Sequence, residues 1–167
     1  LDALFNKSTY NQTNIAWDFV ELPSQLMEHW ATEPEVLNMY AKHYKTNDPI
    51  PADLVQKIIN SGYFNQGFET VEYLAASLLD MKYNTLEAPV NIEVQSFEKD
   101  YLTSIGLIPE ILSRYRSTYF LHIAGGYDSG YYSYIWAAVY DNDAFEAFKE
   151  KGIFDKSVAD SYRKNIL

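Results

Sequence analysis

Residues 66–86 read QGFETVEYLAASLLDMKYNTL, and this stretch decides the fold class. Apolar side chains recur in it every three or four residues, which is the period of a helix with one buried face. They are Phe68, Val71, Leu74, Ala75, Leu78 and Leu79. Met81 and Tyr83 extend the same face. The stretch therefore predicts a long amphipathic helix.

The same spacing recurs on the N-terminal side of this stretch. Residues 18–30 (DFVELPSQLMEHW) place four apolar side chains on one helical face. They are Phe19, Leu22, Leu26 and Trp30. A second helix is predicted from Glu33 to about Tyr44, with Thr32 as its N-cap. A third is predicted to begin at Pro51 and to end at Gly62.

The C-terminal side continues the helical pattern after a looser region. Residues 96–107 predict another helix, and the pattern then weakens up to Phe120. Residues 121–140 (LHIAGGYDSGYYSYIWAAVY) predict a glycine-rich loop that opens into an aromatic helix. Residues 143–167 predict two amphipathic helices joined at Gly152. The fold class that follows is all-α, mainly helical.

Composition excludes several classes of protein. The 167 residues carry 13 Lys and Arg against 23 Asp and Glu, a formal net charge of −10, which disfavours nucleic acid and anionic membranes as partners. A hydrophobic fraction of 47% can build a core, so wholesale disorder is excluded. No apolar run approaches the roughly 18 residues of a membrane span. The absence of cysteine excludes disulfides, thiolate metal sites and a cysteine nucleophile.

The segment from His122 to Tyr134 is the most specific chemical feature. It combines a histidine and two glycines with Tyr127, Tyr131 and Tyr134, which one helical face could carry together. Neutral donors of this kind stabilise an oxyanion, and glycines allow a loop to close on a substrate. From the spacing alone, a catalytic wall and ordinary half-buried tyrosines both stay open.

The other histidines give no metal site by themselves. The three histidines include no pair four residues apart, and a closed metal site needs several converging ligands. His29 and His43 are therefore interpreted as surface or hydrogen-bonded helix residues. Signatures of serine hydrolases and of phosphate-binding loops are absent from the sequence.

Several long strings, in the same order along the chain, resemble one family. Residues 18–30, 64–86, 114–140 and 143–167 are similar to the thimet oligopeptidase family of zinc metallopeptidases, which includes oligopeptidase A and the bacterial peptidyl-dipeptidases. Residues 29–54 resemble the peptidyl-dipeptidase branch. The resemblance implies a peptidase that acts on short peptides, with release of C-terminal dipeptides expected and internal cleavage left open.

The resemblance also implies roles for individual residues. Glu21 matches the glutamate that serves as the third zinc ligand, after the two histidines of an H-E-x-x-H helix. His122, Tyr127 and Tyr134 match residues that bind substrate and stabilise the oxyanion, and Tyr131 matches a further tyrosine of the same wall. In such a site, one zinc ion lowers the pKa of a bound water towards about 7.

Two arginines allow two interpretations. Arg114 and Arg116 either hold the C-terminal carboxylate of a peptide or brace neighbouring acidic residues.

The motif H-E-x-x-H is not found in the 167 residues. By the resemblance it is expected just before Leu1, with Leu1, Leu4 and Phe5 ending an apolar helix that began upstream. Residues 1–167 are accordingly expected to be the C-terminal portion of one catalytic domain, truncated at both ends. The missing N-terminal part would then be the partner, and the chain alone would be inactive.

The alternative is a non-catalytic helical scaffold or peptide-binding module. A cytoplasmic location is expected by the resemblance, and an exposed apolar face would let the fragment self-associate.

Overall fold

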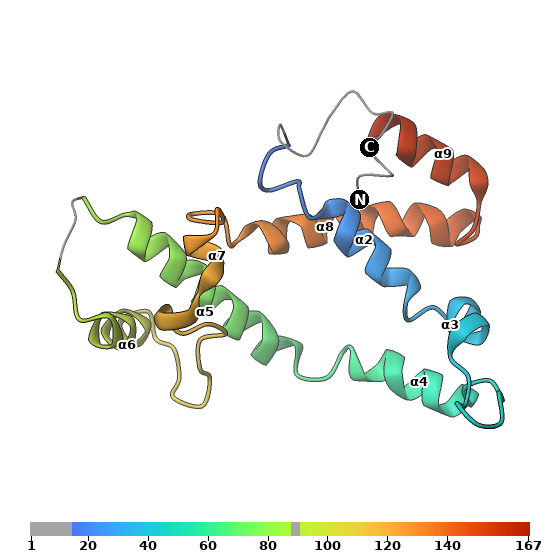
Figure 1. The fold of residues 1–167 in the computed structure, drawn as a ribbon, viewed down its shortest axis with the longest axis horizontal. Helices are drawn as coiled ribbons and strands as arrows, with labels where there is room; N and C mark the ends of the chain where they lie inside the picture. Colours follow the sequence, from blue (N-terminus) through green and yellow to red (C-terminus); the bar gives the residue numbers. More distant parts are fainter. Residues whose placement is uncertain (1–14, 88–90) are drawn as a thin grey trace. The chain divides into compact units, whose positions relative to one another are not determined.

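The computed structural model describes residues 15–87 and 91–167, which form helices joined by short connectors (Figure 1). These ranges contain no strand; their one isolated β-bridge joins Lys42 and Pro49. The predicted all-α class is thereby confirmed for the described part. The predicted helix end at Leu1, Leu4 and Phe5 lies outside the described residues.

The chain divides into two compact units. The first unit contains the described residues up to Tyr63 together with Ser133–Leu167. Its helices are α2 (Leu22–Trp30), α3 (Pro34–Tyr40), α4 (Ala52–Ser61), α8 (Ser133–Lys151) and α9 (Lys156–Asn165). The second unit is Phe64–Tyr132. Its helices are α5 (Gln66–Asn84), α6 (Val94–Ser104), η2 (Ser117–Tyr119) and α7 (Leu121–Ala124).

The core of the first unit forms where α2 lies across α8 (Figure 1). Leu26 of α2 packs against Phe145 and Phe148 of α8 and against Ile153. Trp30 meets both phenylalanine rings edge-on, and its indole Nε1 donates to the Ile153 carbonyl at 2.9 Å. Burial of each large apolar side chain stabilises the unit by about 1.5–3 kcal/mol. This packing holds α2 against α8.

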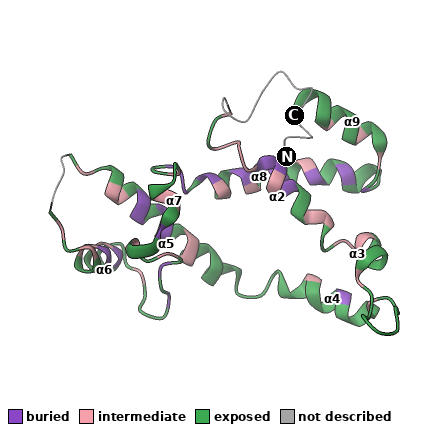
Figure 2. Cartoon of the chain, in the orientation of Figure 1, coloured by how far each residue is buried: buried purple, intermediate pink, exposed green. Residues whose placement is uncertain are grey.

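The core of the second unit is smaller. Ala75 and Leu79 of α5 pack against Leu102 of α6, with partly buried tyrosines around them. The apolar face predicted for α5 is only partly right, because Phe68 and Leu78 are 43% and 42% exposed. Figure 2 shows α5 exposed over its N-terminal half and buried further along. The buried stripe is centred on small residues and on one carboxylate.

The helix predicted from Glu33 to Tyr44 is shorter than expected. It begins at Pro34 with Glu33, and not Thr32, as its N-cap, and it ends at Tyr40. Ala41 leaves the helix because the chain folds back on itself there, with the Ile50 amide donating to the Ala41 carbonyl at 2.8 Å. The third predicted helix is confirmed, since α4 lies between Pro51 and Gly62.

The prediction for residues 121–167 is wrong in one respect. The aromatic helix and the first of the two amphipathic helices are one continuous helix, α8. It ends before Gly152, whose φ of +113° suits glycine, and α9 follows. Tyr127 and Tyr131 lie before the start of α8 at Ser133, so the three tyrosines do not share a helical face.

Candidate active site

A glycine pair places His122 beside Tyr127. The helix α7 ends at Ala124, and the amides of Gly125 and Tyr127 both donate to the His122 carbonyl, at 3.1 and 2.9 Å. A Cβ on Gly125 would stand 2.9 Å from the Leu121 carbonyl oxygen, and Gly126 has a φ of +104°. The loop therefore needs glycine at both positions. As a result, the Tyr127 and His122 rings meet edge-on, with centroids 5.8 Å apart.

A buried carboxylate of α5 holds the turn that follows Tyr127. The Gly130 amide donates to the Tyr127 carbonyl at 2.9 Å, and Ser129 inside this turn has a φ of +58°. Asp80, which is fully buried, accepts the Ser129 amide at 2.9 Å and the Tyr131 amide at 3.0 Å. The Asn84 side chain donates to the same carboxylate at 2.8 Å.

Tyr131 is a core residue of the second unit. It is 2% exposed, and its ring packs against an aromatic cluster. The cluster consists of Tyr73, Tyr115, Phe120 and His122. The hydroxyl of Tyr73 also donates to the Tyr131 carbonyl. The Tyr131 ring thus supports the His122 imidazole, with centroids 4.9 Å apart.

The two arginines have different environments. The Arg116 Nε donates to Glu98 Oε1 at 2.5 Å, and the Glu98 side chain is 5% exposed. The other carboxylate oxygen accepts the Ser117 amide at 2.7 Å and the Ser117 hydroxyl at 2.8 Å. Arg114 instead lies over the Tyr73 ring, with its Cζ 5.8 Å from the centroid. Of the two interpretations, the bracing of an acidic neighbour therefore fits Arg116.

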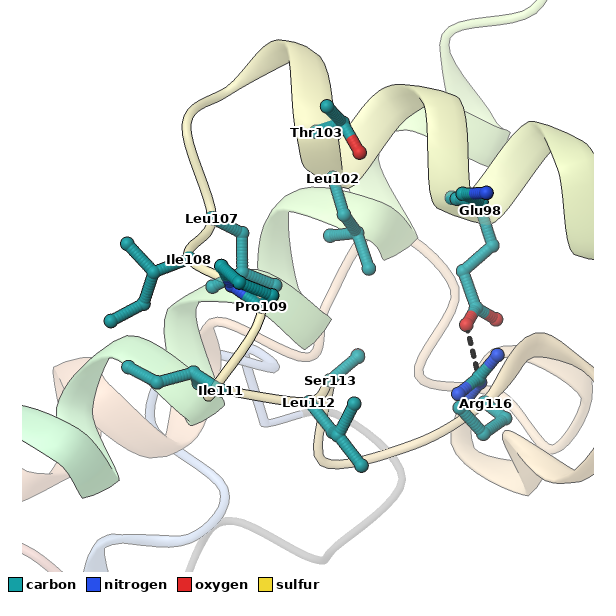
Figure 3. Close-up of a pocket in the computed structure, with 11 residues that line it drawn as sticks. Glu98, Leu102, Thr103, Leu107, Ile108, Pro109, Ile111, Leu112, Ser113 and Arg116 are labelled. Atoms are coloured by element: carbon teal, nitrogen blue, oxygen red, sulfur yellow. Dashed lines mark ion pairs between the residues drawn. The ribbon is translucent and has the colours of Figure 1, made fainter.

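A pocket of about 390 Å³ adjoins the Glu98–Arg116 pair (Figure 3). Its other walls are mainly apolar side chains of α6 and of residues 107–112. Figure 3 shows the ion pair at one end of these walls.

Glu21 stands at the N-terminus of α2. It is the N-cap residue, and its half-buried carboxylate accepts the Ser24 hydroxyl at 2.7 Å. Pro23, in the first turn, favours a helix start at this point. One turn further along, the Gln25 side-chain amide donates to the Tyr134 carbonyl at 3.1 Å. Glu21 of the DFVELPSQ string therefore lies at the N-terminus of the helix that contacts the start of α8.

Asp141 of α8 joins α2 to α8 by polar contacts. Asp141 is 3% exposed, and its carboxylate accepts Gln25 Nε2 at 2.9 Å. It also pairs with His29 Nε2 at 2.7 Å, while the His29 ring stacks on Phe145. The interpretation of His29 as a hydrogen-bonded helix residue is confirmed. His43 is an exposed turn residue that contacts Thr46, and it is not helical.

The predicted site residues belong to both units. His122, Tyr127 and Tyr131 are brought together in the second unit, which also contains Arg114 and Arg116. Glu21 and Tyr134 belong to the first unit.

A zinc ion needs at least three protein ligands. In the described ranges, no three His, Asp or Glu side chains gather to hold a metal. Glu21 fits the part of a single carboxylate ligand, and the remaining ligands would have to come from elsewhere. The described residues also include no helix long and apolar enough to cross a membrane.

Three buried acids were missed by the reasoning from sequence. Asp80, Glu98 and Asp141 each hold backbone or side-chain groups near the predicted site residues. One signal was available for Asp80, a lone carboxylate inside the apolar run LLDM. Such a residue, placed on the buried side of a helix, must find donors in the folded protein.

Comparison with known proteins decides the family. The model of peptidase family M3 matches residues 3–167. The chain belongs to peptidase family M3. This is a family of metallopeptidases, so the resemblance to the thimet oligopeptidase family is confirmed.

Individual relatives agree with this family. The dipeptidyl carboxypeptidase of Escherichia coli is 41% identical over the whole of this chain. Oligopeptidase A of the same organism is 34% identical over 93% of it. A mitochondrial intermediate peptidase of Cryptococcus neoformans is 36% identical over 74% of it. The chain spans about a quarter of the length of the first two relatives, 25% and 23% respectively.

Proposed function

We propose that these residues are part of a zinc-dependent peptidase that cleaves short peptides and releases C-terminal dipeptides. They would supply one zinc ligand and a wall of histidine and tyrosine donors. The observation that carries the proposal is the glycine loop, which sets the His122 and Tyr127 rings against each other in a chain of family M3. The similarity of the whole chain to a dipeptidyl carboxypeptidase supports the dipeptide-releasing activity.

Glu21 is the proposed metal ligand of this chain. Zinc, held by Glu21 and by two histidines from outside the 167 residues, would supply the Lewis acid and the activated water of hydrolysis. The Ser24 hydroxyl donates to one oxygen of the Glu21 carboxylate, which limits rotation of the side chain. The contacts of Gln25 and His29 with Asp141 hold the rest of the helix.

His122, Tyr127 and Tyr134 are the proposed donors to the peptide. A phenol or a protonated imidazole nitrogen stabilises negative charge that develops on the scissile carbonyl oxygen. Tyr134 is assigned the oxyanion, and His122 and Tyr127 are assigned other groups of the bound peptide. Tyr131, whose ring is buried, is assigned the support of His122.

Arg114 is the better candidate of the two arginines for a substrate carboxylate. Arg116 already pairs with a buried carboxylate, whereas the Arg114 guanidinium lies over an aromatic ring. A cation held over a ring keeps donors for a bidentate carboxylate contact.

The ligand assignment is tested by Glu21→Gln in the complete peptidase. The change keeps the size of the side chain but removes the charge, so bound zinc and peptidase rate should both fall sharply. The matched control is Glu28→Gln, an exposed position on the same helix, which should leave both unchanged. Full zinc content and full rate in Glu21→Gln would refute the assignment.

The donor assignment is tested by Tyr134→Phe. Loss of an oxyanion donor lowers kcat by roughly 10²–10³-fold. Tyr140→Phe, at an exposed ring of the same helix, is the control. A change below about threefold in Tyr134→Phe would assign this tyrosine to packing alone.

The second candidate is a peptide-binding module without catalysis. It keeps the contact between the His122 and Tyr127 rings, which could bind a peptide without a metal. Binding of a short peptide at equal affinity with and without zinc, and without turnover by the complete protein, would support it over the peptidase.

A further inference from the structure

The turn between Tyr127 and Tyr131 is held from outside by a single buried carboxylate. The two backbone amides that Asp80 accepts are those of Ser129 and Tyr131, which flank Gly130. Asp80 lies 49 and 51 residues away from them along the chain, so these are tertiary contacts and not local turn bonds. Asn84, one helical turn later on α5, donates to the same carboxylate and keeps it oriented.

The turn needs such a hold because its backbone is strained. Ser129 has a φ of +58°, in the left-handed region, which costs a residue with a Cβ free energy. Acceptance of the Ser129 amide by a carboxylate oxygen of Asp80 stabilises this conformation against the extended alternatives. Within the described ranges, no lysine or arginine pairs with Asp80, so its hydrogen-bonding capacity is directed to these N–H groups.

A second contact holds the same residue, Tyr131, at its carbonyl. The Tyr73 hydroxyl donates to the Tyr131 carbonyl, and the two rings stack at 4.8 Å with an angle of 18°. Tyr131 is therefore held at its amide by Asp80, at its carbonyl by Tyr73 and at its ring by the aromatic cluster. Both holding residues lie on α5, seven residues apart and thus two helical turns from each other.

We propose that Asp80 is a positioning residue, which sets the Tyr127–Tyr131 turn and thereby the place of the Tyr127 phenol beside His122. The inference rests on the proposed function, because it treats Tyr127 as a donor to the substrate. Asp80 itself is fully buried and touches no substrate. Asp80 affects the reaction only through the position of the turn, which Tyr73 helps to hold.

The experiment uses Asp80→Asn in the complete peptidase. Both kcat and KM are measured, and kcat is calculated per bound zinc ion. The amide is isosteric but presents an N–H to one of the two backbone donors, so the turn shifts while the packing volume stays the same. Misplacement of a substrate-positioning group by about 1 Å costs up to about 100-fold. The expected result is a fall in kcat of at least about tenfold, with KM changed less than about threefold.

A double-mutant cycle separates positioning from mere stabilisation. In the Tyr127→Phe background the phenol is already lost, so Asp80→Asn should cost less than about twofold there. Asp100→Asn, an exposed aspartate on α6, is the matched control and should change neither constant. Tyr73→Phe removes only the hydroxyl and keeps the stacked ring, and a fall in kcat of a few fold is expected. This variant also carries the test should Asp80→Asn not fold.

The outcomes distinguish this proposal from the proposed function. Asp80 is not a positioning residue if Asp80→Asn lowers kcat equally in the wild-type and the Tyr127→Phe backgrounds. The same holds if the fall in kcat only matches the fall in the fraction of folded protein. Asp80 is also not a positioning residue if Asp80→Asn and Tyr73→Phe leave kcat unchanged. If Tyr134→Phe lowers kcat in that case, the assignment of the tyrosine donors is still supported. If Tyr134→Phe and Tyr127→Phe also leave kcat unchanged, the donor wall fails and the positioning role fails with it. If the complete protein shows no peptide turnover at all, the proposed function itself fails.

Discussion

Removal of the Asp141 carboxylate should destabilise the first unit strongly. The group is 3% exposed and receives donors from two residues of α2, Gln25 and His29. Asp141→Ala would leave both donors facing an apolar methyl group across the helix interface. Asn142 also donates to Asp141, but it is exposed and keeps its bond to the Ala138 carbonyl.

The size of the effect follows from the stranded donors. An N–H left without a partner at a buried site costs about 1–3 kcal/mol. Two partly buried N–H groups lose their acceptor here, one on His29 Nε2 and one on Gln25 Nε2, whose other N–H keeps the Tyr134 carbonyl. Alanine returns roughly 0.5 kcal/mol through its higher helix propensity. The expected loss is therefore about 2–5 kcal/mol, a large share of the 5–15 kcal/mol typical of a folded domain. Asp141→Asn should cost less, because its oxygen still accepts one donor.

Tryptophan fluorescence in a urea titration measures this loss in the relevant unit. The chain has three tryptophans, Trp17, Trp30 and Trp136, and all three belong to the first unit. Asp143→Ala, two residues along α8 at an exposed position, is the control and should stay within about 0.5 kcal/mol.

The order of stability should be wild type, then Asp141→Asn, then Asp141→Ala. If Asp141→Ala loses no more stability than Asp143→Ala, the polar contacts between α2 and α8 do not hold the helices together. Donors without a partner would then not account for the stability of the first unit.

Three further predictions concern other contacts. Arg116→Gln removes the ion pair with Glu98 and should lower the free energy of unfolding by about 1–2 kcal/mol, measured by circular dichroism. Arg114→Gln should lower it by less. A raised KM of Arg116→Gln at unchanged stability would instead assign Arg116 to the substrate. Burial, followed by the charge of Asp141, raises the pKa of Tyr162 to about 12, whereas an unfolded tyrosine has a pKa of roughly 10. The neutral phenol of Tyr162 therefore contributes its full stabilisation of the fold below pH 10, and this stabilisation is lost between pH 10 and 12. Tyr162→Phe should abolish this alkaline loss without a cost at pH 7, because the hydroxyl has no hydrogen-bond partner among the described residues. Gly126 has a positive φ, so Gly126→Ala should lower the free energy of unfolding by roughly 1–2 kcal/mol. Gly67 lies on α5 with open space around it, so Gly67→Ala should raise the free energy of unfolding by about 0.5 kcal/mol. Thermal unfolding measures both changes.

Helical periodicity was sufficient to predict the class of the fold and most of the helices. It placed α4 between Pro51 and Gly62, where proline and glycine mark the ends. It failed at Tyr40, because the chain leaves the helix for a turn that depends on contacts made ten residues later. It also failed at Tyr131, because a spacing of four and three residues does not distinguish a helix from a turn closed by a distant carboxylate.

The candidate site was predictable in its residue types but not in its support. His122 and Tyr127 could be singled out because a pair of glycines lies between this histidine and this tyrosine. That Tyr131 is buried, and that Asp80, Glu98 and Asp141 hold their neighbours, depends on pairs 19 to 116 residues apart. Spacing along one helix carries no information about such pairs.

The distance along the chain between α2 and its contacts on α8 has a consequence for synthesis on the ribosome. His29 and Asp141 are 112 residues apart. At 5–20 residues per second, α2 leaves the ribosome roughly 6–22 s before its partner exists. During this interval Leu26 and Trp30 have no core to enter, so they are available to chaperones. A metal site that includes Glu21 would accordingly be completed late, after translation of α8.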